Sequence, residues 1–182
     1  MKRILLAFLI LAANYPARAS TTAPYQAACY FGKSETFLPD GTSVATSQAL
    51  IKRKVYADQN LIIERLVVIV PKPGAKPQEF VTIGSVSGST FEIVELGDAF
   101  YGKGELLGPP GNWTAWNSRS VMPGGGVLES HDRLTSGGLV VEKKYFDAAG
   151  KLSVVIKESF PPISESEYKD RYVKLFPPQS AP

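Results

Sequence analysis

Short runs in which hydrophobic and polar residues alternate follow one another along most of the chain. Between residues 111 and 160, four such runs are rich in aromatic and β-branched residues, and each ends at a break containing Gly, Asp, Ser or Pro. The runs are GNWTAWNSRSVM, VLESHDRL, LVVEKKYF and KLSVVIKESF. This composition and spacing are typical of β-strands joined by short turns. The pattern predicts an antiparallel meander over residues 111–160.

The first half of the chain carries further strand-like runs separated by turn residues. We predict strands at 25–31, 43–56, 61–70, 80–86, 90–96 and 99–104. The stretch SQALIKRKVY, residues 47–56, also tolerates a helix, and a strand is the favoured interpretation. Proline-rich residues 71–77 cannot donate to a sheet ladder and are predicted to form a loop. Together these runs predict one all-β domain over residues 20–176, an antiparallel up-and-down barrel or a sandwich of about eight to ten strands.

One amphipathic helix is predicted at the end of the domain, over residues 165–176. Ser164 followed by Glu167 forms a capping box, which satisfies free backbone N–H groups of the first turn. The hydrophobic residues that share one helix face are Tyr168, Tyr172, Leu175 and Phe176. We expect this stripe to pack against the sheet. Residues 177–182 begin with two prolines and are expected to form a disordered tail.

The N-terminal stretch has the features of a secretory signal peptide. Lys2 and Arg3 precede an apolar run at residues 4–13, and residues 17–19 (ARA) match a signal-peptidase site. The apolar run is too short to span a bilayer, so no transmembrane span is expected. We expect cleavage near Ala19 and export of the remaining chain to the periplasm or the extracellular space.

Removal of residues 1–19 changes the charge of the protein. The chain of 182 residues has 20 Lys and Arg against 17 Asp and Glu. Three of these basic residues and none of the acidic residues precede residue 20, so the exported chain would carry no net charge. Nucleic-acid binding by a broad basic surface loses its support, and no nucleic-acid partner is expected.

Residue types that build metal and catalytic sites are scarce. Cys29 is the only cysteine, which excludes an intrachain disulfide, and we expect it to be a buried free thiol in the first strand. His131 is the only histidine and alternates with polar residues, which indicates an outer face. Neither a metal-ligand pattern nor a catalytic motif is present. We expect no cofactor and no metal, and we favour a non-enzymatic function.

Alternation within the meander predicts which side chains face inward. The inward sets are Trp113, Ala115, Asn117, Arg119 and Val121; Leu139, Val141, Lys143 and Tyr145; and Leu152, Val154, Ile156, Glu158 and Phe160. A charge on an apolar face needs a partner, so Arg119, Lys143 and Glu158 are predicted to form an interior network. Two alternatives remain: these positions lie at the mouth of a barrel, or a bulge reverses the two faces.

The same residues form the predicted ligand site. Arg119 and Lys143 would meet an acidic head group, because the guanidinium of Arg119 can donate two parallel hydrogen bonds to a carboxylate. Trp113 and Tyr145 would supply apolar walls, and Glu158 would complete the network.

An exported chain with a meander over residues 111–160 and an amphipathic helix over residues 165–176 resembles the calycin-like antiparallel barrels, of the lipocalin and fatty-acid-binding type. The resemblance is one of architecture and covers about residues 25–176. Residues 111–113 (GNW) also match the lipocalin G-x-W motif. That family places the motif in its first strand, and here it lies past the middle, so its role is not transferred. The resemblance implies a barrel that encloses a small apolar ligand.

Three functions follow from these observations. The leading hypothesis is an exported barrel that binds a small hydrophobic or amphipathic molecule. The second is a filled barrel that acts as an interaction protein of the cell envelope or the extracellular space. The third is a cofactor-free isomerase or cyclase in which Glu158 or a tyrosine transfers a proton.

Overall fold

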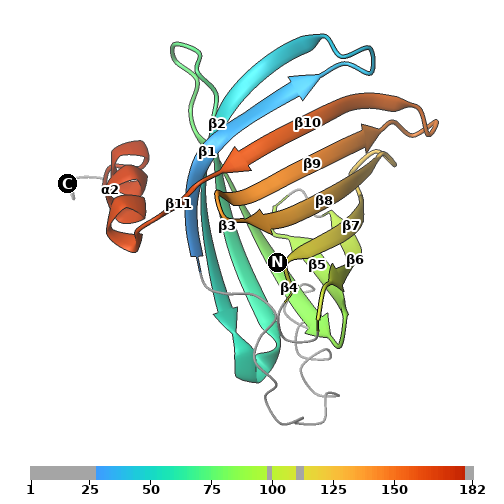
Figure 1. Ribbon diagram of the computed structural model, residues 1–182. Helices are drawn as coiled ribbons and strands as arrows, with labels where there is room; N and C mark the ends of the chain where they lie inside the picture. The colour runs from blue at the N-terminus through green and yellow to red at the C-terminus, as the bar shows by residue number, and fades with distance from the viewer. Residues whose placement is uncertain (1–27, 98–99, 110–112, 179–182) are drawn as a thin grey trace, which may run out of the picture.

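Ten strands follow one another around a barrel in the computed structural model, each antiparallel to the strand before it (Figure 1). The structure describes residues 28–97, 100–109 and 113–178. The strands are β1 (Ala28–Phe37), β2 (Ser43–Tyr56), β3 (Leu61–Ile69), β4 (Gln78–Ser87), β5 (Thr90–Glu95), β6 (Tyr101–Leu107), β7 (Ala115–Val121), β8 (Val127–Thr135), β9 (Gly138–Phe146) and β10 (Leu152–Phe160). A 3₁₀ turn, η1 (Ala57–Gln59), joins β2 to β3, and β10 is followed by the short strand β11 (Pro162–Ile163) and helix α2 (Glu165–Leu175).

The barrel closes where β1 meets the end of the chain. β1 pairs with β10 between Lys33 and Phe37, and with β11 at Cys29 and Tyr30. Gly32 lies between these two pairings, where a side chain would collide with the backbone oxygen of Ser159. A glycine is required there because only its lack of a Cβ lets the two strands approach. Each of the ten strands is thereby paired on both sides within the described residues, which removes the free edges of an open sheet.

One part of the barrel interior is filled by a hydrophobic core. Its buried members are Tyr30, Ala49, Ile51, Val86, Phe91, Leu106, Trp116, Leu139, Val141 and Phe160. Small residues make room for large ones here, since a side chain at Gly104 of β6 would collide with the ring of Phe91. The inward positions of neighbouring strands therefore complement one another in volume.

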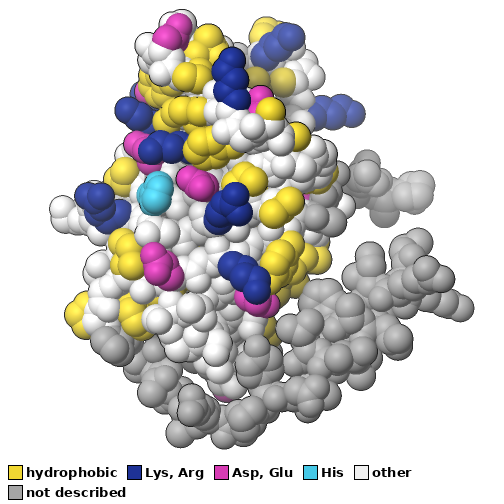
Figure 2. All heavy atoms as spheres, turned by 90° about the vertical axis from the view of Figure 1, so that its right-hand side faces the viewer, with side chains coloured by type: hydrophobic (Ala, Val, Ile, Leu, Met, Phe, Trp, Pro, Cys, Tyr) yellow, Lys and Arg dark blue, Asp and Glu magenta, His cyan; other side chains and the backbone are white. Residues whose placement is uncertain are grey.

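Charged residues of both signs cross the outside of the barrel in register. Glu92, Lys103, Arg119, Glu129 and Lys144 are successive cross-strand neighbours from β5 to β9. Figure 2 shows positive and negative side chains interspersed on this side of the molecule. Ionised groups at these positions require contact with water, so the outside of β5–β9 is a solvated surface. None of the helices in the described part of the chain is long and apolar enough to cross a bilayer.

Helix α2 packs against the outside of β1, β2 and β3 (Figure 1). Ser164 caps its N-terminus and accepts a hydrogen bond from the backbone N–H of Glu167, as predicted. The aromatic stripe of the helix covers an outward-facing cluster whose buried members are Cys29, Leu50, Val67 and Tyr168. The predictions of a packing helix and of a buried Cys29 thiol are both confirmed.

The strand predictions are confirmed in number and type. The boundaries differ most at β1, β6 and β7, the last of which begins at Ala115 and not at residue 111. Residues 43–56 form a single strand and not a helix. β1 continues to Phe37, beyond the predicted end at residue 31, because the polar stretch GKSET is paired on both sides by β2 and β10. β6 runs from Tyr101 to Leu107, three residues beyond the predicted end. The predicted signal peptide at residues 1–19 and residues 179–182 of the predicted tail lie outside the described residues.

The hydroxyl group of Tyr168 gives a stability test of the helix interface. This oxygen is buried and has no hydrogen-bond partner among the described residues, and burial raises the pKa of Tyr168 to about 12. We expect Tyr168→Phe to raise the free energy of unfolding by about 1 kcal/mol in urea titrations, because it removes an unsatisfied buried donor. Tyr172→Phe is the matched control. It removes a 3.0 Å hydrogen bond to Glu79 and should not stabilise the protein. A loss of stability in Tyr168→Phe would contradict this account.

Candidate ligand cavity inside the barrel

An unfilled cavity of about 290 Å³ lies inside the barrel beside the hydrophobic core. Its lining comes from the inward faces of β2–β5 and β7–β10 and from Phe100, which precedes β6. Large apolar side chains of this wall include Ile62, Leu66, Phe80, Phe91, Trp116 and Leu128. Protein interiors contain few voids larger than a water molecule, so a cavity of this size is the first candidate for a binding site.

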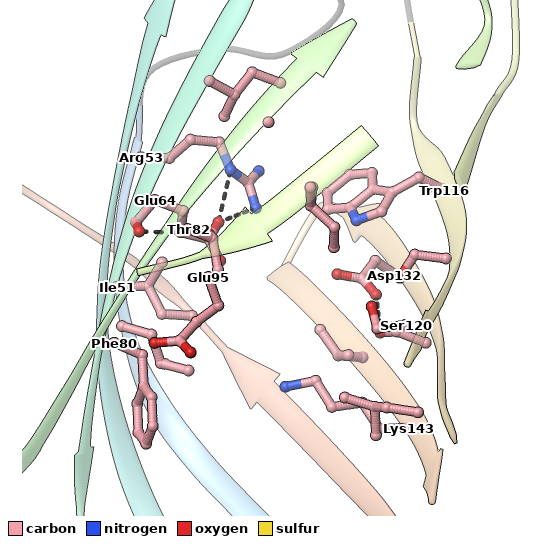
Figure 3. A pocket seen from close by; sticks show the side chains of 18 of the residues that line it. Ile51, Arg53, Glu64, Phe80, Thr82, Glu95, Trp116, Ser120, Asp132 and Lys143 are labelled. Carbon is pink, nitrogen blue, oxygen red and sulfur yellow. Dashed lines mark hydrogen bonds and ion pairs between the residues drawn. The ribbon is translucent and has the colours of Figure 1, made fainter. Parts of the chain in front are cut away.

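Six ionisable side chains also line the cavity, and acids outnumber bases. The bases are Arg53 and Lys143, and the acids are Glu64, Glu95, Asp132 and Glu158. Figure 3 shows Arg53, Glu64 and Glu95 on one wall, with Trp116, Asp132 and Lys143 on the wall across from them. Charges enclosed by protein lose their hydration, so each needs a partner or shifts its pKa.

Arg53 and Glu64 form the first ion pair of the cavity. They are direct cross-strand neighbours on β2 and β3, and both point inward. Two guanidinium nitrogens of Arg53 donate to Oε2 of Glu64 at 2.9 and 2.6 Å. The guanidinium also lies 5.0 Å from the ring centre of Trp116, within the range of a cation–π contact. Arg53 is therefore fully engaged by its neighbours.

Lys143 and Glu158 form the second ion pair. Nζ of Lys143 lies 2.6 Å from Oε2 of Glu158, across β9 and β10. Glu158 is buried, and Lys143 keeps about a quarter of its surface accessible, at 8% and 23%. Burial alone would lower the pKa of Lys143, but the carboxylate of Glu158 raises it, and the net pKa is above its usual value. Lys143 thus stays protonated and is matched by Glu158.

Asp132 is the acid of the cavity for which the described residues supply no ion pair within 4 Å. Its carboxylate accepts a hydrogen bond from the hydroxyl of Ser130 on the same strand. Asp132 is only partly exposed, and its side chain lines the cavity. Burial raises the pKa of Asp132 to about 6, against the lowering effects of Ser130 and Lys143. The carboxylate is therefore accessible from inside the cavity and poorly solvated.

Two of the five predicted site residues, Lys143 and Glu158, lie together at the cavity and form the predicted interior pair. Tyr145 shares the inward face of β9 with Lys143, but it lies farther along the strand, against Gly126, and is not part of the cavity lining. Trp113 is half-buried against the core and precedes the first residue of β7. Whether any of these residues contacts a ligand remains a prediction.

The predicted inward position of Arg119 is wrong. Its side chain is 65% exposed on the outside of the barrel and lies 3.6 Å from Glu129. The inward residues of β7 are instead Trp116, Ser118 and Ser120. Trp113 lies before the strand, and no apolar periodicity distinguishes the two faces of AWNSRSV, so alternation alone does not identify the inward face of β7. His131 lies on the outside as predicted, where Nδ1 is 2.8 Å from Oδ1 of Asn117.

Four charged residues of the cavity, Arg53, Glu64, Glu95 and Asp132, were missed, although the sequence contains the signal that identified Lys143. Arg53 stands among the alternating apolar residues Ile51 and Val55, and Glu64 stands between Ile62 and Leu66. Asp132 alternates with Leu128 and Leu134 on β8 in the same way. A charge within an apolar alternation is therefore a usable indicator of an interior ion or ion pair in this chain.

A second hollow, of about 350 Å³, lies outside the barrel between α2 and the strands β2 and β3. It contains four basic residues, Lys52, Lys54, Arg65 and Lys169. Lys52 and Lys169 both pair with Glu165, and Arg65 pairs with Glu79. Two carboxylates thus face four basic side chains, and three of the four bases already lie within an ion pair. The interior cavity has the more extensive apolar lining and is the stronger candidate site.

Two further observations bear on the chemistry of the cavity. Among the residues that the structure describes, no three His, Cys, Asp or Glu are placed to hold a metal ion. Glu158 lies in the cavity and is not exposed to solvent, so the isomerase hypothesis remains an alternative, with a carboxylate that is already bound to Lys143.

Comparison with other proteins adds no family assignment: no protein-family model matches the chain, and no curated protein matches it in sequence. The architecture itself, a closed ten-strand antiparallel barrel followed by one helix, is calycin-like.

Removing one partner of the Lys143–Glu158 ion pair should destabilise the protein more than replacing both partners. Lys143→Met leaves the carboxylate of Glu158 buried without its partner, and we expect a loss of about 3–5 kcal/mol in the free energy of unfolding. Adding Glu158→Leu to the Lys143→Met variant should recover much of the lost free energy of unfolding. The outer pair Lys103–Glu92 is the control, because both side chains are about half exposed or more, and Lys103→Met should leave the free energy of unfolding nearly unchanged. Equal effects at the two pairs would contradict the assignment.

The raised pKa of Asp132 implies that the free energy of unfolding depends on pH. A folded-state pKa of about 6 exceeds the unfolded value of about 3.9, so the protein loses stability as the pH rises from about 4 through 6. Asp132→Asn removes the ionisable group and should be more stable than wild type by about 1–3 kcal/mol at pH 7. The difference should disappear near pH 4. Urea titrations at both pH values measure it, and a variant less stable than wild type at pH 7 would contradict the burial of an ionised Asp132.

Proposed function

We propose that the protein binds a small, mostly apolar molecule inside its barrel. The observation that carries this proposal is the 290 Å³ cavity, which is walled by aromatic and aliphatic side chains and left unfilled next to a tightly packed core. Its volume lies near the lower end of the range for ligand pockets, about 300–1,000 Å³. A compact molecule, such as one aromatic ring with a short side chain, fits this volume better than a long acyl chain.

The expected acidic head group is not retained in the proposal. Arg119, which would have received it, lies outside the barrel. The two bases of the cavity, Arg53 and Lys143, are already bound to Glu64 and Glu158. A ligand carboxylate would have to displace one of these acids and would add negative charge to an interior that already contains four acidic groups.

The cavity favours ligand binding over the alternative of a filled barrel, because that alternative requires side chains to occupy the whole interior. The export of the chain remains part of the proposal and rests on the signal-peptide pattern of residues 1–19. A barrel that acts outside the cytoplasm would meet small molecules in the periplasm or the medium.

Substitutions on opposite faces of β7 test the proposal. Ser118 lines the cavity, whereas the next residue, Arg119, faces solvent. We expect 2-phenylethanol, a neutral probe, to bind wild type at one site and Ser118→Leu at least about tenfold more weakly, because the added side chain fills the cavity. Arg119→Leu should bind as wild type does. Saturation-transfer NMR and calorimetry give the affinities, and circular dichroism checks that each variant is folded.

Native mass spectrometry of gently purified protein is the second measurement. We expect a small molecule to co-purify with wild type and with Arg119→Leu, and to be absent from Ser118→Leu. Absence of any such molecule, together with no binding of the neutral probe, would refute a ligand-binding role.

A further inference from the structure

We propose that Asp132 recognises a cationic nitrogen of the ligand, so that the cavity selects small apolar amines over the corresponding alcohols and acids. This inference rests on the proposed ligand-binding function and goes beyond it by naming the polar group of the ligand and the residue that binds it.

The charges of the cavity lining favour a cation. Arg53 and Lys143 are neutralised within the ion pairs to Glu64 and Glu158. The lining contains four acids and two bases, a formal excess of two negative charges. Glu95 already has an interaction of its own. In a space screened from water such an excess attracts a cation and repels a carboxylate strongly.

Asp132 lies next to an aromatic ring suited to the same role. Trp116 and Asp132 are direct cross-strand neighbours on β7 and β8, and both point into the cavity (Figure 3). Tryptophan is the best cation–π partner among the aromatic residues, and the ring of Trp116 already lies within 5.0 Å of the Arg53 guanidinium. A carboxylate beside such a ring offers an ammonium group one ionic and one aromatic contact.

The other groups that face Asp132 leave its charge unmatched. Ser130 on β8 donates one hydrogen bond, which a carboxylate with two oxygens can accept while binding a further donor. Lys143 on β9, the nearest candidate partner, is held at 2.6 Å by Glu158. Arg53 and Glu64 on β2 and β3 act on Asp132 with opposite signs. A ligand cation is therefore the missing counter-charge.

The enclosed position of Asp132 supports the same conclusion energetically. An ionised carboxylate that is screened from water and lacks a counter-charge is disfavoured, and the rise in the pKa of Asp132 to about 6 has burial as its largest cause. A protonated amine in the cavity would restore the lost stabilisation. Perturbed acids that lie in a cavity are frequent at functional sites.

Three probes with a shared phenylalkyl body test the inference: 2-phenylethylamine, 2-phenylethanol and 3-phenylpropionate. At pH 7.5 we expect the amine to bind wild type about 10- to 100-fold more tightly than the alcohol, with the acid weakest. Asp132→Asn should reduce amine affinity to near that of the alcohol and leave alcohol affinity unchanged. Glu129→Gln, on the same strand but facing outward beside Arg119, is the matched control and should keep the preference for the amine.

A pH series on wild type tests the same contact without a substitution. Between pH 7 and pH 5 amine affinity should fall about tenfold, as expected when an acid with a pKa of about 6 is protonated, whereas alcohol affinity should not change. The inference is overturned if the alcohol or the acid binds as tightly as the amine, if Asp132→Asn keeps the amine preference, or if amine affinity is constant over this pH range. Failure of all three probes to bind would instead refute the ligand-binding function itself.

Discussion

Pairing of β1 with β10 and β11 is the constraint on which the rest of the structure depends. Closure makes every strand an interior strand, so alternate residues face an enclosed space whether they are polar or not. Closure also brings the first strand against the last strands of the barrel. Along β1 the pairing partner changes from β11 to β10 at Gly32, where the absence of a side chain lets the backbones approach. The outward face of the same seam carries the cluster covered by α2, which ties the helix to the closure of the barrel.

Inside the closed barrel, ion pairs between adjacent strands also specify register. Arg53 reaches Glu64 because β2 and β3 place them directly opposite each other, and Lys143 reaches Glu158 diagonally across β9 and β10. A slip of one residue would move one partner of each pair to the outside and leave the other buried without a counter-charge, which costs several kcal/mol. The ion pairs thus strongly disfavour wrong strand registers, even where their net contribution to the stability of the correct register is small.

The parts of the structure that follow from local pattern were predictable from sequence, and those that follow from cross-strand fit were not. β9 and β10 alternate apolar residues regularly, so the inward positions of Lys143 and Glu158 could be read directly. β7 has no such alternation, because its inward serine at 118 stands opposite Gly104, in a region that the large ring of Phe91 occupies. That complementarity of volumes involves three strands and leaves no trace in the sequence of β7 alone. The place of Asp132 beside Trp116 likewise required the register of β7 against β8.

Two unfavourable features coincide in one place in this barrel. An apolar cavity that side chains leave unfilled lacks the packing contacts that a larger side chain would supply. Asp132, a carboxylate at the cavity wall without an ion pair, loses part of its hydration. A barrel selected for stability alone would be expected to fill the first and neutralise the second. A single occupant with an apolar body and a cationic nitrogen would relieve both at once, since its body would fill the volume and its charge would pair with Asp132. Binding of one such ligand therefore accounts for both the cavity and the position of Asp132 beside it, which stability alone would not favour.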